Sequence, residues 1–107
     1  MKWLGITTKV INPNHPLTIL KYYACGGGKK IDLVRLADIR LLDNLFECKD
    51  ERQYNRILIY DIDELNSWRD LKELSDICDR YNKDYTIVKQ DLHSDVEVPI
   101  GYLTSVL

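Results

Sequence analysis

One short stretch decides the fold class of this chain: Ile57-Leu58-Ile59-Tyr60-Asp61-Ile62-Asp63-Glu64-Leu65. Its apolar first half is typical of a strand that is buried on both faces, between two layers of helices. An amphipathic helix is predicted next, over Ser67–Asn82, and a further strand over Tyr85–Lys89. Strand, helix and strand in this order predict a parallel unit with a right-handed crossover.

The residues before this stretch show the same alternation of strand and helix. They predict a strand over 2–8, a helix from Asn14 or His15 to Gly26, a short strand over 30–35 and a helix capped by Asp38. The segment 31–46 is also open to interpretation as one long helix. We therefore expect a single three-layer α/β domain over residues 1–107, with a mostly parallel four-stranded sheet in the order 2-1-3-4.

Size and composition are those of a soluble globular domain. The chain has 107 residues, of which 45% are hydrophobic and 30% charged, enough for one core. It has no apolar run long enough for a membrane helix and no signal-peptide pattern, so we expect a cytoplasmic protein without a membrane partner. The cysteines Cys25, Cys48 and Cys78 form no Cys-x-x-Cys pair, and we expect them to be reduced and buried.

Charge is distributed unevenly along the sequence. Residues 1–40 carry seven Lys or Arg against two Asp, whereas residues 41–107 carry eight basic and fifteen acidic residues. An acidic half disfavours DNA as a partner, because affinity for DNA rests largely on neutralising phosphates. We interpret the charge blocks as solvated helix faces that disperse in space, with an acidic patch for a basic protein partner as the alternative.

The second half of the chain resembles the catalytic domain of the serine recombinases, the resolvase and invertase family. The resemblance rests on the strand ending in Asp63 and Leu65, on the helix and strand that follow, and on the segment with Pro99, Gly101 and Leu103. It implies a resolvase-like fold that derives from a phage or mobile element. In the family the last segment opens a helix that makes dimer contacts and leads to a separate DNA-binding domain, which we do not expect here.

The catalytic residues of that family are missing. The run Asp63-Glu64-Leu65-Asn66-Ser67 takes the place of Asp-Arg-Leu-Ser-Arg, so Glu64 and Ser67 occupy the positions of two active-site arginines. In the first strand, one alignment puts Thr8 and Val10 at the positions of the Arg and the nucleophilic Ser. An alignment shifted by a residue or two brings Thr7 or Thr8 to the Ser, but then no Arg precedes it. Attack on a phosphodiester builds negative charge that fixed guanidinium groups stabilise, and a Glu there reverses the sign of the field. We therefore predict no recombinase activity.

These observations lead to a first hypothesis and two alternatives. The first is a non-catalytic protein-interaction domain, an inhibitor or regulator without a cofactor, which binds a protein partner or dimerises through the C-terminal segment. Its apolar interface residues would be Ile100, Tyr102, Leu103, Val106 and Leu107. The weakest alternative is a recombination-linked DNA-binding protein.

The second hypothesis is an enzyme for Mg²⁺-dependent phosphoryl transfer. Asp61 and Asp63 follow a buried strand, and ligands bind at the carboxyl ends of strands in open α/β sheets. Two carboxylates there could hold Mg²⁺, with Asp91 or Asp95 as a further ligand. The competing interpretation is that Asp61 and Asp63 flank a turn. His15 and His93 are expected to be exposed loop residues.

Overall fold

A five-stranded mixed sheet forms the centre of the molecule, in the order β2-β1-β3-β4-β5. The computed structural model describes residues 2–48, 51–65 and 67–95. Neighbours among the first four strands are parallel, and β5 is antiparallel to β4. The strands are β1 Lys2–Thr7, β2 Ile31–Arg35, β3 Tyr54–Ile59, β4 Asp84–Ile87 and β5 Leu92–His93.

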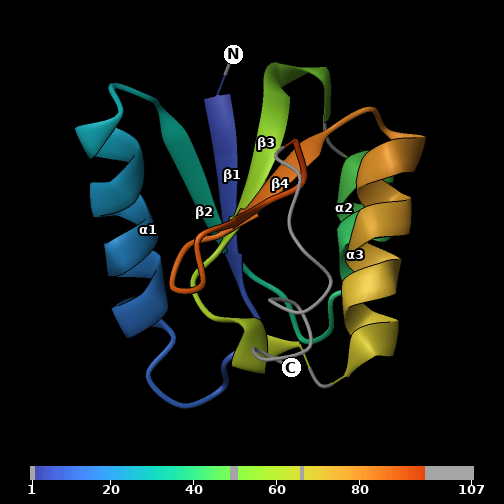
Figure 1. Ribbon diagram of the computed structural model, residues 1–107, viewed down its shortest axis with the longest axis horizontal. Helices are drawn as coiled ribbons and strands as arrows, with labels where there is room; N and C mark the ends of the chain where they lie inside the picture. The colour runs from blue at the N-terminus through green and yellow to red at the C-terminus, as the bar shows by residue number, and fades with distance from the viewer. Residues whose placement is uncertain (1, 49–50, 66, 96–107) are drawn as a thin grey trace.

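Three helices cover the sheet from two sides. Figure 1 shows α1 on one side of the sheet, and α2 and α3 together on the other. The helices are α1 Asn14–Gly26, α2 Leu41–Cys48 and α3 Trp68–Arg80, with 3-10 turns η1 Glu51–Gln53 and η2 Ile62–Glu64. None of the helices in the described part of the chain has the length and apolar character needed to cross a bilayer. The expected α/β class and the helix layers on both faces are confirmed.

The helix boundaries follow from local chemistry. Ser67 caps α3, because its hydroxyl accepts a hydrogen bond from the Arg69 amide at 3.2 Å. The chain leaves α3 through Asn82, which adopts the left-handed conformation at φ 57°. Gly28, at φ 69°, has the same role after α1. The stretch that sequence left open is a strand, β2, followed by the separate helix α2.

The expectation of four strands is wrong, because a fifth strand follows β4. The polar residues of this region favour a loop, yet Asp91 reverses the chain in the left-handed conformation at φ 54°. Its amide donates to the Val88 carbonyl at 3.2 Å. The turn lets Leu92 return beside Ile87 and become buried in the core. The order 2-1-3-4 is found for the first four strands, with β5 added beyond β4.

The two sides of the sheet differ in how much apolar surface they bury. The larger core cluster lies on the side of α2 and α3 and includes residues such as Ile57, Leu74 and Ile77. The smaller cluster on the α1 side has Leu20, Ala24 and Leu58 as its buried members. Helix α1 packs mainly against β1, β2 and β3. The α1 side of β4 and β5 therefore carries polar side chains.

Gly5 lets α1 approach the sheet closely. A methyl group at this position would lie 2.8 Å from Leu33 Cδ2, 3.0 Å from Ile31 Cδ1 and 3.2 Å from Leu20 Cδ1. These distances are shorter than ordinary van der Waals contacts, so a larger residue would push the helix and β2 outward. Glycine in β1 thus sets the spacing between α1 and the sheet.

The three cysteines have different environments. Cys78 is buried in α3 as expected, and burial raises the pKa of its thiol to about 12. Cys25 and Cys48 are exposed, which corrects the expectation that all three are buried. Both lie near the C-terminal ends of their helices, outside the buried stripes formed by Leu20 and Ala24 in α1 and by Leu42 and Phe46 in α2.

Candidate functional site

Two of the four positions that the family resemblance assigns to catalysis, those of Thr8 and Glu64, meet at the carboxyl edge of the sheet. Thr7 is the last residue of β1, Thr8 follows it, and Glu64 ends the η2 turn after β3. The Thr7 hydroxyl donates to Glu64 Oε1, and the Thr8 amide donates to the same oxygen at 3.1 Å. The Thr8 hydroxyl donates to the Glu64 carbonyl at 2.9 Å. Thr8 and Glu64, which occupy positions of two arginines in the resembled family, thus bind each other.

The second Glu64 oxygen completes a capping box. Oε2 accepts from the Asp61 amide at 3.4 Å, while Asp61 Oδ1 accepts from the Asp63 amide at 3.1 Å. The spacing of Asp61 and Glu64 is that of a capping box, in which each side chain satisfies an amide of the other end of the turn. Glu64 is 7% exposed. The depression beside it has a volume of about 100 Å³, below the size of ordinary ligand pockets.

Asp61 is fully engaged by the segment that follows β4. Lys89 Nζ lies 3.0 Å from Oδ2, and Gln90 Nε2 donates to Oδ1 at 2.9 Å. Burial of the Asp61 carboxyl opposes its ionisation, but hydrogen bonds from Gln90 and the Asp63 amide, together with Lys89, outweigh burial and lower its pKa. The Asp61 carboxylate is therefore an ionised anchor for the chain after β4.

The other carboxylates that the sequence suggested as metal ligands are exposed or paired elsewhere. Asp63 is exposed, Asp91 bonds His93, and Asp95 pairs with Arg56. Within residues 2–48, 51–65 and 67–95, no group of three or more His, Cys, Asp or Glu is arranged to hold a metal ion. The turn interpretation of Asp61 and Asp63 is the one that this geometry supports.

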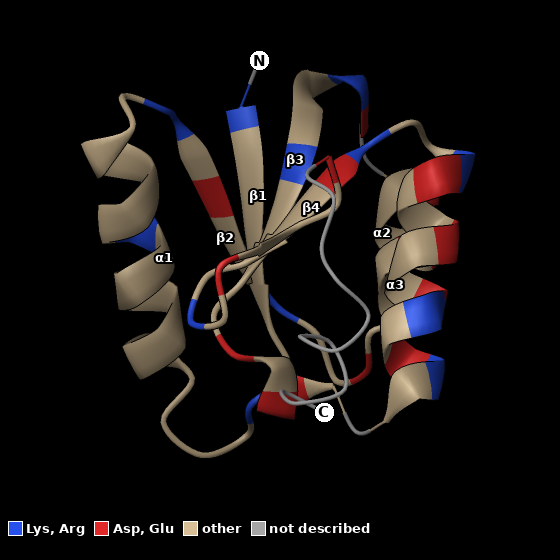
Figure 2. Ribbon diagram, in the orientation of Figure 1, with Lys and Arg blue, Asp and Glu red and all other residues tan. Residues whose placement is uncertain are grey.

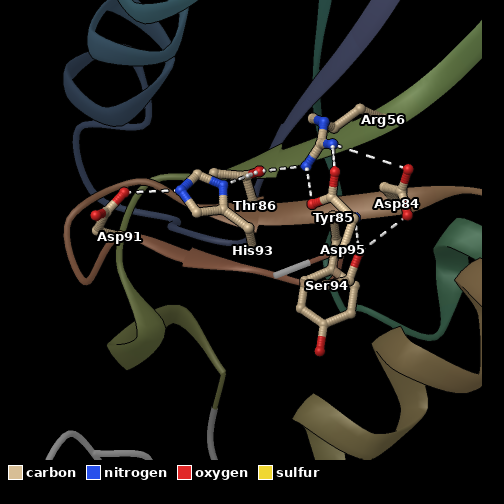
Figure 3. Close-up of polar contacts among 8 residues, drawn as sticks. All are labelled: Arg56, Asp84, Tyr85, Thr86, Asp91, His93, Ser94 and Asp95. Carbon is tan, nitrogen blue, oxygen red and sulfur yellow. Dashed lines mark hydrogen bonds and ion pairs between the residues drawn. The ribbon is translucent and has the colours of Figure 1, made fainter. Parts of the chain in front are cut away.

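A second polar constellation lies on β3, β4 and β5, on the side of the sheet where α1 packs (Figure 3). Arg56 of β3 donates to the Thr86 hydroxyl of β4 at 2.8 Å. Thr86 is paired with His93 of β5, and His93 Nδ1 lies 2.9 Å from Thr86 Oγ1. His93 Nε2 lies 2.7 Å from Asp91 Oδ1. The expectation that His93 is an exposed loop residue is wrong, because the hairpin places it in β5 and leaves its side chain 23% exposed.

The order Asp91, His93, Thr86 is that of a carboxylate, an imidazole and a hydroxyl in a hydrolase triad. Thr86 Oγ1 already accepts from Arg56, so its own proton is available to His93 Nδ1. The two ring nitrogens of His93 thus join the Thr86 hydroxyl to the Asp91 carboxyl. The Thr86 side chain is only 1% exposed, so its hydroxyl has no open approach for a substrate. This geometry supports a structural role, in which the array fastens β5 to β4.

Acidic side chains complete the constellation around Arg56. Asp95 accepts from the guanidinium at 2.6 Å and 3.2 Å, and Asp84 lies 3.8 Å away. The hydrogen bond from Arg56 lowers the pKa of the Asp95 carboxyl. The adjacent depression, of about 280 Å³, is lined in part by Trp3 and Tyr23. The guanidinium charge is thus balanced within the protein.

The sequence signals for this array were weak. Arg56, Thr86 and His93 are far apart in the sequence and are brought together only by the strand order and the β4–β5 hairpin. The predicted interface residues Ile100, Tyr102, Leu103, Val106 and Leu107 lie outside the described residues.

Comparisons of the chain with family models, with curated proteins and with solved structures give no match.

Proposed function

We propose that this protein is a non-catalytic protein-interaction domain on a resolvase-like scaffold, acting in the cytoplasm as an inhibitor or regulator. Support comes from the carboxyl edge of the sheet, where Thr8 and Glu64 satisfy each other and Asp61 is held by Lys89. A phosphoryl-transfer site needs cationic groups or a metal facing the reacting phosphate. The groups gathered at this edge are instead bonded within the fold.

The observation that carries the proposal is the set of large apolar side chains left exposed in the first part of the chain. Ile11 is 87% exposed, Val10 73% and Tyr22 73%. Of the large hydrophobic residues exposed within the described chain, only Trp68 lies beyond residue 41. Large apolar side chains left exposed to this degree can mark contacts with another protein.

The C-terminal segment remains part of this proposal as a second contact. If Leu103 and its apolar neighbours form a helical stripe, a partner protein or a second copy of the chain would cover that stripe. Replacing Leu103 with Asp should then weaken association while the domain stays folded. Light scattering combined with circular dichroism separates these two effects.

A pull-down from lysate of the native host tests the proposal. The wild type is compared with a double variant, Ile11→Ser with Tyr22→Ser, and with Trp68→Ser as the control. Trp68 is 51% exposed and lies on α3, across the sheet from α1. We expect a protein that is retained saturably by the wild type and the control, and lost by the double variant.

Two results would contradict the proposal. One is equal retention by all three baits, or retention by none of them. The other is a covalent protein–DNA adduct, attached through Thr7 or Thr8, after incubation with supercoiled plasmid.

A further inference from the structure

The outer edge of β2 is open in the part of the chain that the structure describes. β2 ends the strand order, so its only paired neighbour there is β1. The Trp3 amide donates to the Lys30 carbonyl, and the Leu36 amide donates to the Thr7 carbonyl, both at 2.9 Å. Even-numbered residues of this segment therefore direct their backbone groups toward β1. Because successive residues of a strand alternate, Ile31, Leu33 and Arg35 direct their N–H and C=O groups outward.

A groove runs beside this edge. Lys21 and Cys25 of α1, Lys29 and Lys30 of the connection, and Ile31 to Leu33 of β2 line a cavity of about 760 Å³. Leu33 is 38% exposed there. The groove thus combines an unpaired strand edge with an apolar side chain, the two features that a pairing strand contacts.

The charge of the groove is basic. Lys21, Lys29 and Lys30 are all exposed, and α1 carries Lys21 but no Asp or Glu. Figure 2 shows the basic colour, and no acidic colour, on α1. The acidic residue in the lining, Asp32, accepts from Lys2 at 3.2 Å and from Tyr54 at 2.6 Å. Its charge is therefore balanced by a lysine outside the groove. Three of the seven basic residues of the 1–40 block thus line this one groove.

We propose that the open edge of β2 binds an extended acidic segment of a partner protein, which adds a sixth strand to the sheet. This inference rests on the proposed function and names its contact surface. Outward N–H and C=O groups of Ile31, Leu33 and Arg35 pair with the partner backbone, which makes the contact independent of most side chains. Acidic side chains on the face shared with α1 lie near Lys21 and Arg35, and apolar ones lie on the opposite face beside Val34.

Charge selects this occupant over two others. A second copy of β2 paired edge to edge would bring the lysines of both copies together, and like charges across strands are destabilising. Single-stranded nucleic acid would use the lysines but leave the outward backbone groups unpaired, because its sugar–phosphate backbone cannot add a strand to a sheet. An acidic strand satisfies both the lysines and the backbone.

The test uses the full chain and a synthetic peptide, acetyl-Glu-Val-Glu-Val-Glu-Val-Glu-amide. Amide hydrogen exchange, followed by NMR, reports on β2 residue by residue. The peptide should slow exchange about tenfold or more at Ile31, Leu33 and Arg35, because these amides gain acceptors. The inward amides of Asp32 and Val34 should change little. This odd–even difference would not arise from a peptide attracted only by charge.

Matched variants separate the backbone from the charges. Lys29→Glu with Lys30→Glu should raise the dissociation constant about tenfold, which corresponds to about 1.4 kcal/mol. The control, Arg69→Glu with Lys72→Glu on α3, should leave the constant unchanged. Leu33→Pro removes one outward N–H, at a strand edge where proline is tolerated, and should also weaken binding. Circular dichroism confirms that each variant is folded.

Several outcomes would overturn the inference. One is that millimolar peptide leaves the amide exchange of Ile31, Leu33 and Arg35 unchanged. Another is that a peptide with Lys in place of Glu binds as tightly as the acidic peptide. A third is that an oligothymidylate protects these amides as strongly as the acidic peptide does. Protection of the same amides in the free protein, with a dimer by light scattering, would assign the edge to a second copy. If the peptide does not protect the β2 amides but the pull-down still captures a protein that depends on Ile11 and Tyr22, the proposed function stands and only this contact surface is wrong.

Discussion

The two sides of the sheet carry out different tasks. On the side of α2 and α3, two helices seal a large apolar cluster that extends from Leu4 to Leu92. On the other side, α1 alone covers a smaller cluster centred on Leu20 and Leu58. The difference indicates that one side of the sheet supplies most of the buried apolar surface, while the other side presents the contact surfaces. Burial on one side holds the sheet together, which allows the α1 side to expose apolar, basic and polar groups.

The largest effect is expected from truncation in the larger cluster. Leu74 is completely buried in α3, so Leu74→Ala should lower the free energy of unfolding by about 3–5 kcal/mol. Urea denaturation followed by circular dichroism measures it. A loss below about 1.5 kcal/mol would mean that the packing of α3 is not the main source of stability on that side of the sheet.

The matching change on the other side should cost less. Leu20 is also completely buried, but only one helix encloses it, so the site can collapse more readily. We expect Leu20→Ala to cost about 2–3 kcal/mol. The same urea titration, with an unchanged denaturant slope as the control, compares the pair. Equal losses would show that the two sides enclose their cores equally well.

Asp61 links the carboxyl edge to the segment after β4, and its effect should depend on pH. Asp61→Asn loses the ion pair with Lys89 and should cost about 1–2 kcal/mol near neutral pH. Because folding lowers the pKa of Asp61 below its ordinary value of 3.8, its contribution is present above that value. It is lost as the pH falls through the lower, folded pKa. Urea titrations from pH 7 to 2 should converge for the two proteins, and parallel curves would contradict this linkage.

The Arg56 and Asp95 pair should have a smaller effect. Asp95 is exposed, and such pairs contribute about 0–1 kcal/mol. We expect Asp95→Asn to change global stability by no more than this. Faster amide exchange at Ser94, whose N–H donates to the Tyr85 carbonyl at 2.9 Å, should report local loosening of β5. Unchanged exchange at Ser94 would show that Thr86 and His93 suffice to hold the hairpin.

Magnesium is expected to have no specific effect. If Asp61 and Asp63 form only the η2 turn, MgCl₂ should raise the melting temperature no more than an equal ionic strength of NaCl. A site filled at one hundred times its dissociation constant would add about 2.7 kcal/mol. A magnesium-specific shift that disappears in Asp63→Asn would favour the phosphoryl-transfer hypothesis.

Much of the fold was predictable because periodicity records burial. The stripe of Leu71, Leu74 and Ile77 identified α3, and the apolar run beginning at Ile57 identified β3. The fifth strand was missed, because β5 has only two residues and carries no alternating pattern. Its one local signal was Asp91, a residue type that tolerates the left-handed conformation of a turn.

The candidate site was predictable only in part. The spacing of Asp61 and Glu64 was a readable capping signal, and Glu64 was identified as a residue that removes the catalytic charge. Its bonds to Thr7 and Thr8 depend on β1 and β3 lying side by side, which no local pattern states. Arg56, Thr86 and His93 likewise lie together only because β3, β4 and β5 are neighbours in the sheet.

The sequence by itself determined the alternation of strands and helices, the buried faces and the excess of positive charge in the first forty residues. These are properties of neighbouring residues, since propensity and periodicity act over a few turns or strand positions. Tertiary structure alone decided that Thr8 would meet Glu64 and that Arg56 would meet Asp95. Strand order sets such contacts, because it joins segments whose separation along the chain carries no record of their distance in space.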